Sequence, residues 1–252
     1  MPERVPQARP LDGRVAVVTG AGRGIGRAIA RGFAEAGAAV CCVARTAGEV
    51  EAAAAEICAR GGRALAAAAD VRDESAVAHA YEATARAFGG LDLVVLNAGV
   101  DTARASVEEG DPRGWREAIE VNLFGAYTCA RLAIPHLRRR GAGKIITVGS
   151  GLGHRGMVGR SAYSASKAAL WMLTRVLAQE VAPYRISVNE LVPGPVLTQI
   201  AAAADAETVA SPVFANGWLK APEDVVPLAL FLATQPDVGP TAQSWSLLRR
   251  DG

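Results

Sequence analysis

The sequence predicts an α/β fold, with one parallel β-sheet covered by helices on both faces. Short apolar runs rich in β-branched residues alternate with longer stretches of helical periodicity, and a glycine-rich turn follows the first run. Such alternation favours right-handed crossovers and the doubly wound arrangement. Ligands of these sheets bind at the carboxyl ends of the strands, so the residues that follow each run are the candidate site.

Seven apolar runs are the expected strands. They cover residues 14–19, 39–43, 64–68, 91–96, 144–148, 185–191 and 244–248. A chain of 252 residues is the size of one such domain. We expect a single domain over residues 11–252, preceded by a flexible tail over residues 1–10, where Pro2, Pro6 and Pro10 are interspersed with charges.

Composition excludes several classes of function. The chain is 50% hydrophobic and 21% charged, as in ordinary soluble proteins, and its net charge of +2 is too small to indicate nucleic acid as a partner. No apolar run reaches the roughly 18 residues of a membrane span, and the first residues do not resemble a signal peptide. The four cysteines show neither metal-ligand spacing nor a disulfide framework. We expect a cytoplasmic protein without a metal site.

The turn after the first run has the pattern of a phosphate cradle. Gly20, Gly24 and Gly26 stand between the apolar run and a helix-period stretch over residues 27–36. Glycines let backbone amides approach a pyrophosphate, and the helix that follows presents unpaired N–H groups to it. Tight turns also use glycine without binding a ligand, but the strand–turn–helix context favours a dinucleotide.

Tyr163 and Lys167 are four residues apart in a helix-period stretch. This spacing places a phenol and an ammonium on one helix face. A nearby positive charge favours the phenolate, so Lys167 is expected to lower the pKa of Tyr163 from its usual value near 10. The phenol then becomes a proton donor and acceptor near neutral pH.

These motifs occur in one order along the chain, together with three further ones. They are Thr19-Gly20-x-x-x-Gly24-x-Gly26, Asn97-Ala98-Gly99, Asn122, Ser150 and Tyr163-x-x-x-Lys167. From about Leu11 to Leu248 the chain therefore resembles a short-chain dehydrogenase/reductase, most closely the single-domain 3-oxoacyl-carrier-protein reductase type. The resemblance implies a Rossmann fold and an oxidoreductase that transfers a hydride between nicotinamide and a carbonyl or secondary alcohol.

The resemblance also implies roles for four catalytic residues. Tyr163 would be the general acid in reduction and the base in oxidation, and Ser150 would donate to the substrate oxygen. Lys167 would tune Tyr163 and bind the nicotinamide ribose, and Asn122 would hold a water that links Lys167 to solvent. Taken singly, Ser150 could be only a turn residue and Asn122 only a helix cap or kink.

The end of the second expected strand indicates which dinucleotide binds. Ala44 stands where relatives that prefer NAD carry Asp, and Arg45 follows it, while Arg23 lies in the glycine turn. A 2′-phosphate needs cations without a nearby carboxylate, so the pattern favours NADP(H) over NAD(H). Alternatively, Arg45 stacks on adenine or lies in solvent.

Further cofactor contacts are implied by the resemblance. Asp70 and Val71 would meet the adenine, and the Val196 backbone and Thr198 hydroxyl would meet the nicotinamide carboxamide, although Thr198 could be an ordinary helix N-cap. The complete set of expected cofactor-binding residues is Gly20, Arg23, Gly24, Ile25, Gly26, Arg45, Asp70, Val71, Asn97, Ala98, Gly99, Tyr163, Lys167, Pro193, Gly194, Val196 and Thr198.

The sequence thus predicts an NADPH-dependent ketoreductase for a small or medium organic substrate. The alternative is a catalytically silent NADP(H)-binding regulatory protein of the same fold. Substrate selection is expected in the loop after Ser150, where Arg160 is interpreted as a solvated arginine or an anion contact, and in a lid over residues 199–219. By resemblance, a homotetramer is expected, or else a dimer, although the final residues depart from the usual ending of the family.

Overall fold

The computed structural model describes residues 9–198 and 219–248. Most of the predicted tail, nearly all of the expected lid and the last four residues lie outside this range. The predictions made for those segments therefore remain predictions.

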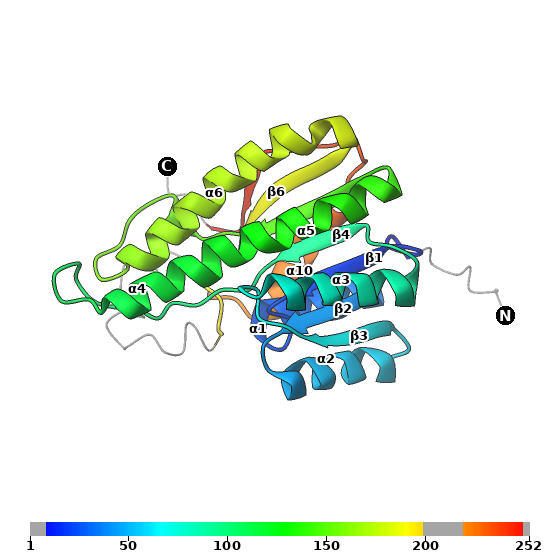
Figure 1. Ribbon diagram of the computed structural model, residues 1–252, viewed down its shortest axis with the longest axis horizontal. Helices are drawn as coiled ribbons and strands as arrows, with labels where there is room; N and C mark the ends of the chain where they lie inside the picture. Colours follow the sequence, from blue (N-terminus) through cyan, green and yellow to red (C-terminus); the bar gives the residue numbers. More distant parts are fainter. Residues whose placement is uncertain (1–8, 199–218, 249–252) are drawn as a thin grey trace.

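A seven-stranded parallel sheet forms the centre of the fold, in the order β3-β2-β1-β4-β5-β6-β7 (Figure 1). Its strands are β1 (Val15–Thr19), β2 (Ala39–Ala44), β3 (Arg63–Ala68), β4 (Leu93–Leu96), β5 (Gly143–Val148), β6 (Ile186–Val192) and β7 (Ser244–Ser246). All seven predicted strands are confirmed, with ends that shift by one or two residues. The doubly wound fold class is confirmed with them.

Helices cover both faces of this sheet. One layer consists of α1 (Gly24–Glu35), α2 (Ala47–Ala59) and α10 (Val226–Thr234), and the other of α3 (Glu74–Phe88), α5 (Gly125–Arg140) and α6 (Ser161–Val181). Short elements complete the described chain: α4 (Pro112–Ile119), a π-helical turn η1 (Glu120–Phe124), and the 3₁₀ turns η2 (Gly151–Gly153), η3 (Ala182–Tyr184) and η4 (Pro222–Val225).

Each face of the sheet packs its own apolar core. Ile29 and Phe33 of α1 pack on one face, and Tyr81 of α3 and Leu170 of α6 pack on the other. The inner strands, among them β1, β2, β5 and β6, are buried on both sides, which is why they read as continuous apolar runs. Burial of this apolar surface supplies the main stabilisation of the fold.

One buried carboxylate ties together the amino-terminal ends of two neighbouring strands. Asp92, just before β4, accepts a hydrogen bond from the Val15 backbone N–H at 2.8 Å. Its other oxygen accepts from Arg140 Nε, also at 2.8 Å. Arg140, the last residue of α5, thus has a structural contact at the opposite end of the sheet from the predicted site.

Strand order reverses between β1 and β4, because β2 and β3 lie on one side of β1 and β4 to β7 on the other. A crevice forms at such a switch point, outside the carboxyl ends of the strands. The glycine turn follows β1 and the Asn97 motif follows β4. The fold therefore places these two motifs next to each other.

Two negative findings concern the described residues alone. None of the helices in that part of the chain combines the length and the apolar character needed to cross a bilayer. No cluster of His, Cys, Asp and Glu there has the arrangement of a metal site. Among the four free cysteines only Cys58 is exposed, and burial raises the pKa of Cys41 to about 11.

Candidate active site

The glycine turn is held in a backbone conformation that favours glycine. Gly20 and Gly24 have positive φ angles of 65° and 55°. A Cβ on Gly26 would lie 2.3 Å from the Gly20 carbonyl oxygen, so the start of α1 packs directly on the turn. Asn97 closes this arrangement from β4, because its Nδ2 donates to the Thr19 carbonyl oxygen at 2.9 Å.

The amino terminus of α1 is open to an anion. The N-cap residue, Arg23, makes no side-chain capping hydrogen bond, so it does not occupy the first N–H groups of the helix. Those N–H groups and the helix dipole favour a phosphate at this position. A pyrophosphate therefore fits the cradle that the sequence predicts.

A cleft of about 270 Å³ runs across the carboxyl edge of the sheet. Most of the predicted cofactor-binding residues line it: Gly20, Arg23, Gly24, Ile25, Arg45, Asp70, Val71, Asn97, Ala98, Gly99, Tyr163, Lys167, Pro193 and Thr198. Gly194 and Val196 instead line a second, adjoining cavity. Gly26 lines neither cavity, and its role is the close packing of helix on turn.

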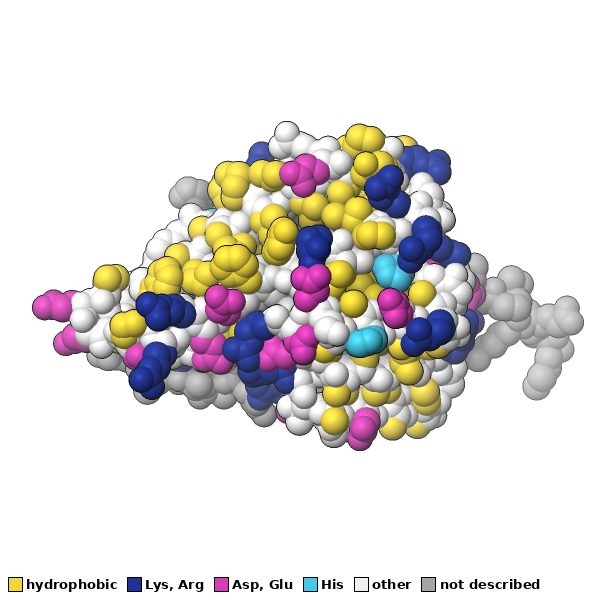
Figure 2. Space-filling model, viewed as in Figure 1, with side chains coloured by type: hydrophobic (Ala, Val, Ile, Leu, Met, Phe, Trp, Pro, Cys, Tyr) yellow, Lys and Arg dark blue, Asp and Glu magenta, His cyan; other side chains and the backbone are white. Residues whose placement is uncertain are grey.

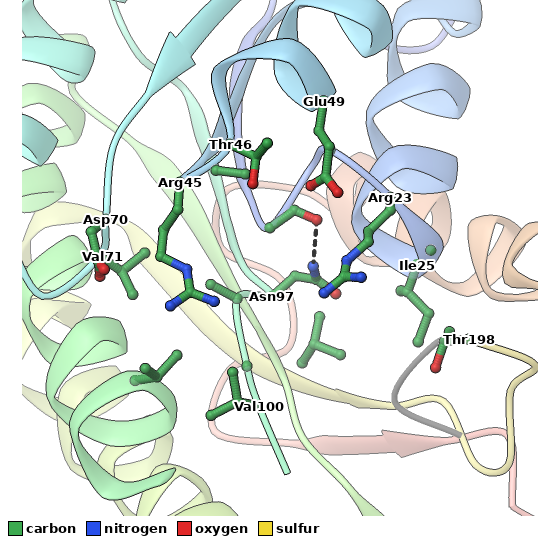
Figure 3. A pocket seen from close by; sticks show the side chains of 18 of the residues that line it. Arg23, Ile25, Arg45, Thr46, Glu49, Asp70, Val71, Asn97, Val100 and Thr198 are labelled. Atoms are coloured by element: carbon green, nitrogen blue, oxygen red, sulfur yellow. Dashed lines mark hydrogen bonds between the residues drawn. The ribbon is translucent and has the colours of Figure 1, made fainter. Parts of the chain in front are cut away.

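Charged side chains surround one end of the cleft. Arg23 and Arg45 extend into it from the glycine turn and from the end of β2, as Figure 3 shows. Glu49, in the first turn of α2, lies beside Arg23 and was not predicted from the sequence. Asp70 is held by Arg72, whose Nη2 lies 2.6 Å from Asp70 Oδ2 and whose hydrogen bonds lower the pKa of the carboxyl. Asp70 therefore faces the cleft as an anion already paired with a cation.

The other end of the cleft holds the predicted catalytic residues. Tyr163 and Lys167 lie on the same face of α6, and Lys167 Nζ is 5.8 Å from the centre of the phenol ring. Ser150, directly after β5, lies close enough to Tyr163 for its hydroxyl to lower the pKa of the phenol. Its Oγ also accepts from the Leu152 backbone N–H at 3.2 Å. The structure thus brings the phenol, the hydroxyl and the ammonium together on one wall.

The pKa values of Tyr163 and Lys167 are shifted differently from the expectation. Burial raises the pKa of Tyr163, and the hydrogen bond with Ser150 and the charges of Arg160 and Arg104 only partly offset that effect. Burial lowers the pKa of Lys167 to about 8, against the opposing charge of Glu190. Lys167 Nζ donates to the Val148 carbonyl oxygen at 2.8 Å, and its charge does not lower the pKa of Tyr163 as predicted.

Asn122 is fully buried in the π-helical turn, where its side chain joins two segments of the site. Its Oδ1 accepts from the Val100 backbone N–H at 2.8 Å, and its Nδ2 donates to the Val100 carbonyl oxygen at 2.9 Å and to Ser166 Oγ at 3.0 Å. The amide therefore holds the loop after β4 against α6. The predicted water between Asn122 and Lys167 stays a prediction.

A second cavity of about 170 Å³ adjoins the first at Tyr163. Ser150, Leu152, Met157 and Leu248 supply part of its lining. A charged group also lines it: Asp101, Arg104, Arg155 and Arg160. Of these, the sequence pointed only to Arg160, and its interpretation as a solvated arginine is wrong, because its side chain is 11% exposed and pairs with Asp101.

His154, in the same loop, does not line either cavity. Its Nε2 lies 2.9 Å from Glu190 Oε2, and its ring packs edge-on against Trp171. No local sequence signal could have paired these residues, since His154 and Glu190 are 36 residues apart.

Comparison with known proteins agrees with this geometry. The model of the short chain dehydrogenase family matches residues 14–208, and the chain belongs to this family. It is therefore an oxidoreductase of the class that acts on alcohol or carbonyl groups with a nicotinamide cofactor.

Three relatives illustrate the range of the family. A cis-4-hydroxycyclohexanecarboxylate dehydrogenase of Sinomonas cyclohexanicum is 41% identical over 225 residues, which are 88% of this chain and 89% of the relative. The crystal structure of a 3-ketoacyl-ACP reductase from Sinorhizobium meliloti 1021 is 36% identical, with a TM-score of 0.84 over 92% of this chain and 96% of that one. An NAD⁺-bound xylitol dehydrogenase is 26% identical, with a TM-score of 0.88 over 94% of this chain and 98% of that one.

Proposed function

We propose that the protein is an NADPH-dependent ketoreductase that interconverts a carbonyl group and a secondary alcohol on a small or medium organic substrate. One observation carries this proposal: Tyr163 lines both cavities, so a dinucleotide cleft and a small, partly apolar cavity meet at a phenol. The names of the relatives agree, since one dehydrogenates a hydroxy acid and another reduces a ketoacyl group.

A bound nicotinamide cofactor would supply the hydride, and side chains of the protein would stabilise the negative charge that develops on the substrate oxygen. As the substrate oxygen gains negative charge, Tyr163 donates a proton to it and Ser150 donates a hydrogen bond. Both donors are held in place before the reaction, which favours the transition state over the ground state. Ser150 and Tyr163 both line the second cavity, so both hydroxyls can reach a substrate oxygen bound there.

Lys167 and Asn122 support the reaction site at Tyr163 without touching the substrate oxygen. The ammonium of Lys167 lies in the cofactor cleft, where it offers a donor for a ribose hydroxyl. Asn122 bonds to Val100 and to Ser166, and so holds the loop after β4 against the helix that carries Lys167. In this proposal Asn122 is a positioning residue.

The preference for NADPH rests on the cationic end of the cleft. Arg23 and Arg45 both line it, and Ala44 leaves the end of β2 without a carboxylate that would bind a ribose 2′-hydroxyl. Glu49 also lines this end and opposes a 2′-phosphate, so Arg23 and Arg45 must outweigh it. The NAD⁺ in the xylitol dehydrogenase structure belongs to a relative that shares 26% of its residues with this chain.

We further propose a homotetramer, with a dimer as the alternative. Apolar side chains gather on the outer faces of α5 and α6 (Figure 2). Phe124, Tyr127, Met172 and Val176 are 52%, 47%, 48% and 43% exposed. Contiguous exposed apolar surface of this kind marks an interaction site.

Replacement of the phenol tests the proposed reaction. Tyr163→Phe keeps the ring and removes the proton donor, so turnover of carbonyl substrates should fall at least about a hundredfold. NADPH affinity, measured by fluorescence titration, should change by less than about tenfold, because the rest of the cleft is unaltered. A Tyr163→Phe enzyme with full activity would remove the phenol from the mechanism, and wild-type protein that binds NADPH but reduces no carbonyl in a broad panel would indicate the regulatory alternative.

A further inference from the structure

The second cavity contains a cluster of charged side chains next to the proposed reaction centre. Three arginines and one aspartate line it, together with Ser150 and Tyr163. Asp101, Arg104 and Arg160 lie close enough to the phenol for their charges to affect its pKa. Whatever these arginines bind therefore lies near the atom that is reduced.

Asp101 only partly neutralises Arg160, because it is shared between two guanidinium groups. Its side chain is 1% exposed, and the same oxygen, Oδ2, accepts from Arg160 Nη1 and from Arg104 Nε, the latter at 3.0 Å. One carboxylate thus faces two cations. Oδ2 of Asp101 is therefore divided between them, and Arg160 can bind a further anion as well.

Arg160 retains donors for such an anion. Its side chain is 11% exposed, and its pairing with Asp101 uses only one of its nitrogen atoms. Guanidinium groups bind carboxylates through two parallel hydrogen bonds, and they do so best where water is largely excluded. Arg155, on the same wall, is exposed and has no ion pair within the described residues, so it can add a second positive charge.

We propose that the substrate carries a carboxylate, held by Arg160 and Arg155, in addition to the carbonyl or hydroxyl group that reacts at Tyr163. The inference rests on the proposed oxidoreductase function and specifies its substrate class. The cavity volume of about 170 Å³ suits a small oxo or hydroxy acid. Leu152, Met157 and Leu248 provide an apolar lining for the carbon skeleton between the two polar groups.

Matched pairs of acids and amides test this proposal. Levulinate is compared with levulinamide, and a cyclohexanone carboxylate with its carboxamide, as substrates with NADPH. The kcat/KM of each acid should exceed that of its amide by about tenfold to a hundredfold, the range of a charge-assisted hydrogen bond. In Arg160→Gln and Arg155→Gln this ratio should fall, mainly through a higher KM for the acid.

Two controls separate charge recognition from loss of structure. Arg113→Gln alters an exposed arginine of α4 that lines neither cavity, and should leave the ratio unchanged. Arg160→Lys keeps the positive charge and should retain part of the preference for the acid. Because Arg155 is exposed and unpaired in the described chain, Arg155→Gln tests the proposal even if loss of Arg160 unfolds the loop.

A binding measurement distinguishes failure of the subsite from failure of the proposed function. Hexanoate and hexanamide have no ketone, and their affinities can be measured by calorimetry without turnover. Hexanoate should bind at least about tenfold more tightly than hexanamide, and Arg160→Gln should abolish the difference. Equal affinity of the two ligands, or equal turnover of acids and amides, would overturn the carboxylate subsite and leave a ketoreductase of neutral substrates. Tight hexanoate binding without reduction of any carbonyl would instead contradict the oxidoreductase proposal.

Discussion

Glu190 is a buried carboxylate that influences the ammonium of the active site from β6. It is fully buried, its Oε2 accepts from Ser244 Oγ at 2.5 Å, and the same oxygen lies 2.9 Å from His154 Nε2. Its negative charge raises the pKa of Lys167, while burial lowers that pKa more strongly, to about 8. The charge state of Lys167 near neutral pH therefore depends on Glu190.

Glu190→Gln should shift the pH dependence of activity to lower pH. Carbonyl reduction requires the charged form of Lys167 in this mechanism, so kcat/KM in the wild type should fall as pH rises through about 8. Removal of the negative charge lowers the pKa of Lys167 further, and the falling limb should move by about half a unit or more towards acid pH. The measurement is a pH profile of kcat/KM. Glu180→Gln, at an exposed position of α6, should leave the limb in place, and an unmoved limb in Glu190→Gln would contradict the coupling.

Arg45→Ala should weaken NADPH binding much more than NADH binding. The two cofactors differ only in the 2′-phosphate, and Arg45 lines the cleft at the end of β2, where that phosphate is expected. Loss of a charge-assisted contact should cost NADPH about tenfold or more in affinity. Titration of both cofactors against wild type and variant measures this difference. Equal losses for the two cofactors would place the 2′-phosphate elsewhere.

At the scale of the elements, the glycine turn and α1 form one rigid unit. Gly26→Ala should destabilise the protein by about 1–3 kcal/mol, because the new Cβ would lie 2.3 Å from the backbone oxygen of Gly20, which cannot rotate away. Cofactor affinity should fall with it, since relief of the clash displaces the phosphate cradle. Urea denaturation and cofactor titration measure the two effects.

A second helical glycine is the matched control for that variant. Nothing lies within 4 Å of a Cβ built on Gly48 in α2. Gly48→Ala should therefore stabilise the protein slightly, by about 0.5 kcal/mol, because it restricts the unfolded chain and adds no clash. Gly26→Ala that is as stable as wild type and binds cofactor equally well would contradict the packing argument.

The strands and the motifs at their ends could be predicted because both are local signals. Buried parallel strands are continuous apolar runs, and a glycine turn or a Tyr–Lys pair on a helix is complete within a few residues. The charges of the second cavity are not local. Asp101 and Arg160 are 59 residues apart, and both follow strands in irregular loops, where periodicity carries no information about pairing.

The depth of burial of Tyr163 and Lys167 also could not be predicted from the sequence. The i, i+4 spacing of Tyr163 and Lys167 correctly places them on one face of α6. The spacing does not reveal how deeply each group lies, and desolvation is the first cause of both pKa shifts. The sequence therefore indicated which residues form the site, but not the direction in which the pKa of Tyr163 is shifted.

At the scale of the whole molecule, the site and the exposed apolar surface share the same helices. Tyr163 and Lys167 lie near the start of α6, whereas Met172 and Val176 lie further along the same helix. Asn122 stands in the turn that leads into α5, beside exposed Phe124. Association through α5 and α6 would therefore support the elements that position the catalytic wall.

A double substitution on this surface tests the proposed assembly. The wild-type protein, with a chain mass of 26.0 kDa, should have the mass of a tetramer or dimer in light scattering. Phe124→Asp/Tyr127→Asp should reduce that mass, because an interface that desolvates two unpaired carboxylates loses several kcal/mol of association energy, about 2–3 for each.

Val238→Asp, at an apolar position that is 84% exposed outside these helices, is the control and should keep the wild-type mass. Wild-type protein that is a 26.0 kDa monomer, or a double variant with unchanged mass, would show that α5 and α6 do not form the contact. If the double variant dissociates and also loses activity while it stays folded, assembly through α5 and α6 is needed to hold Asn122 and Tyr163 in their working positions.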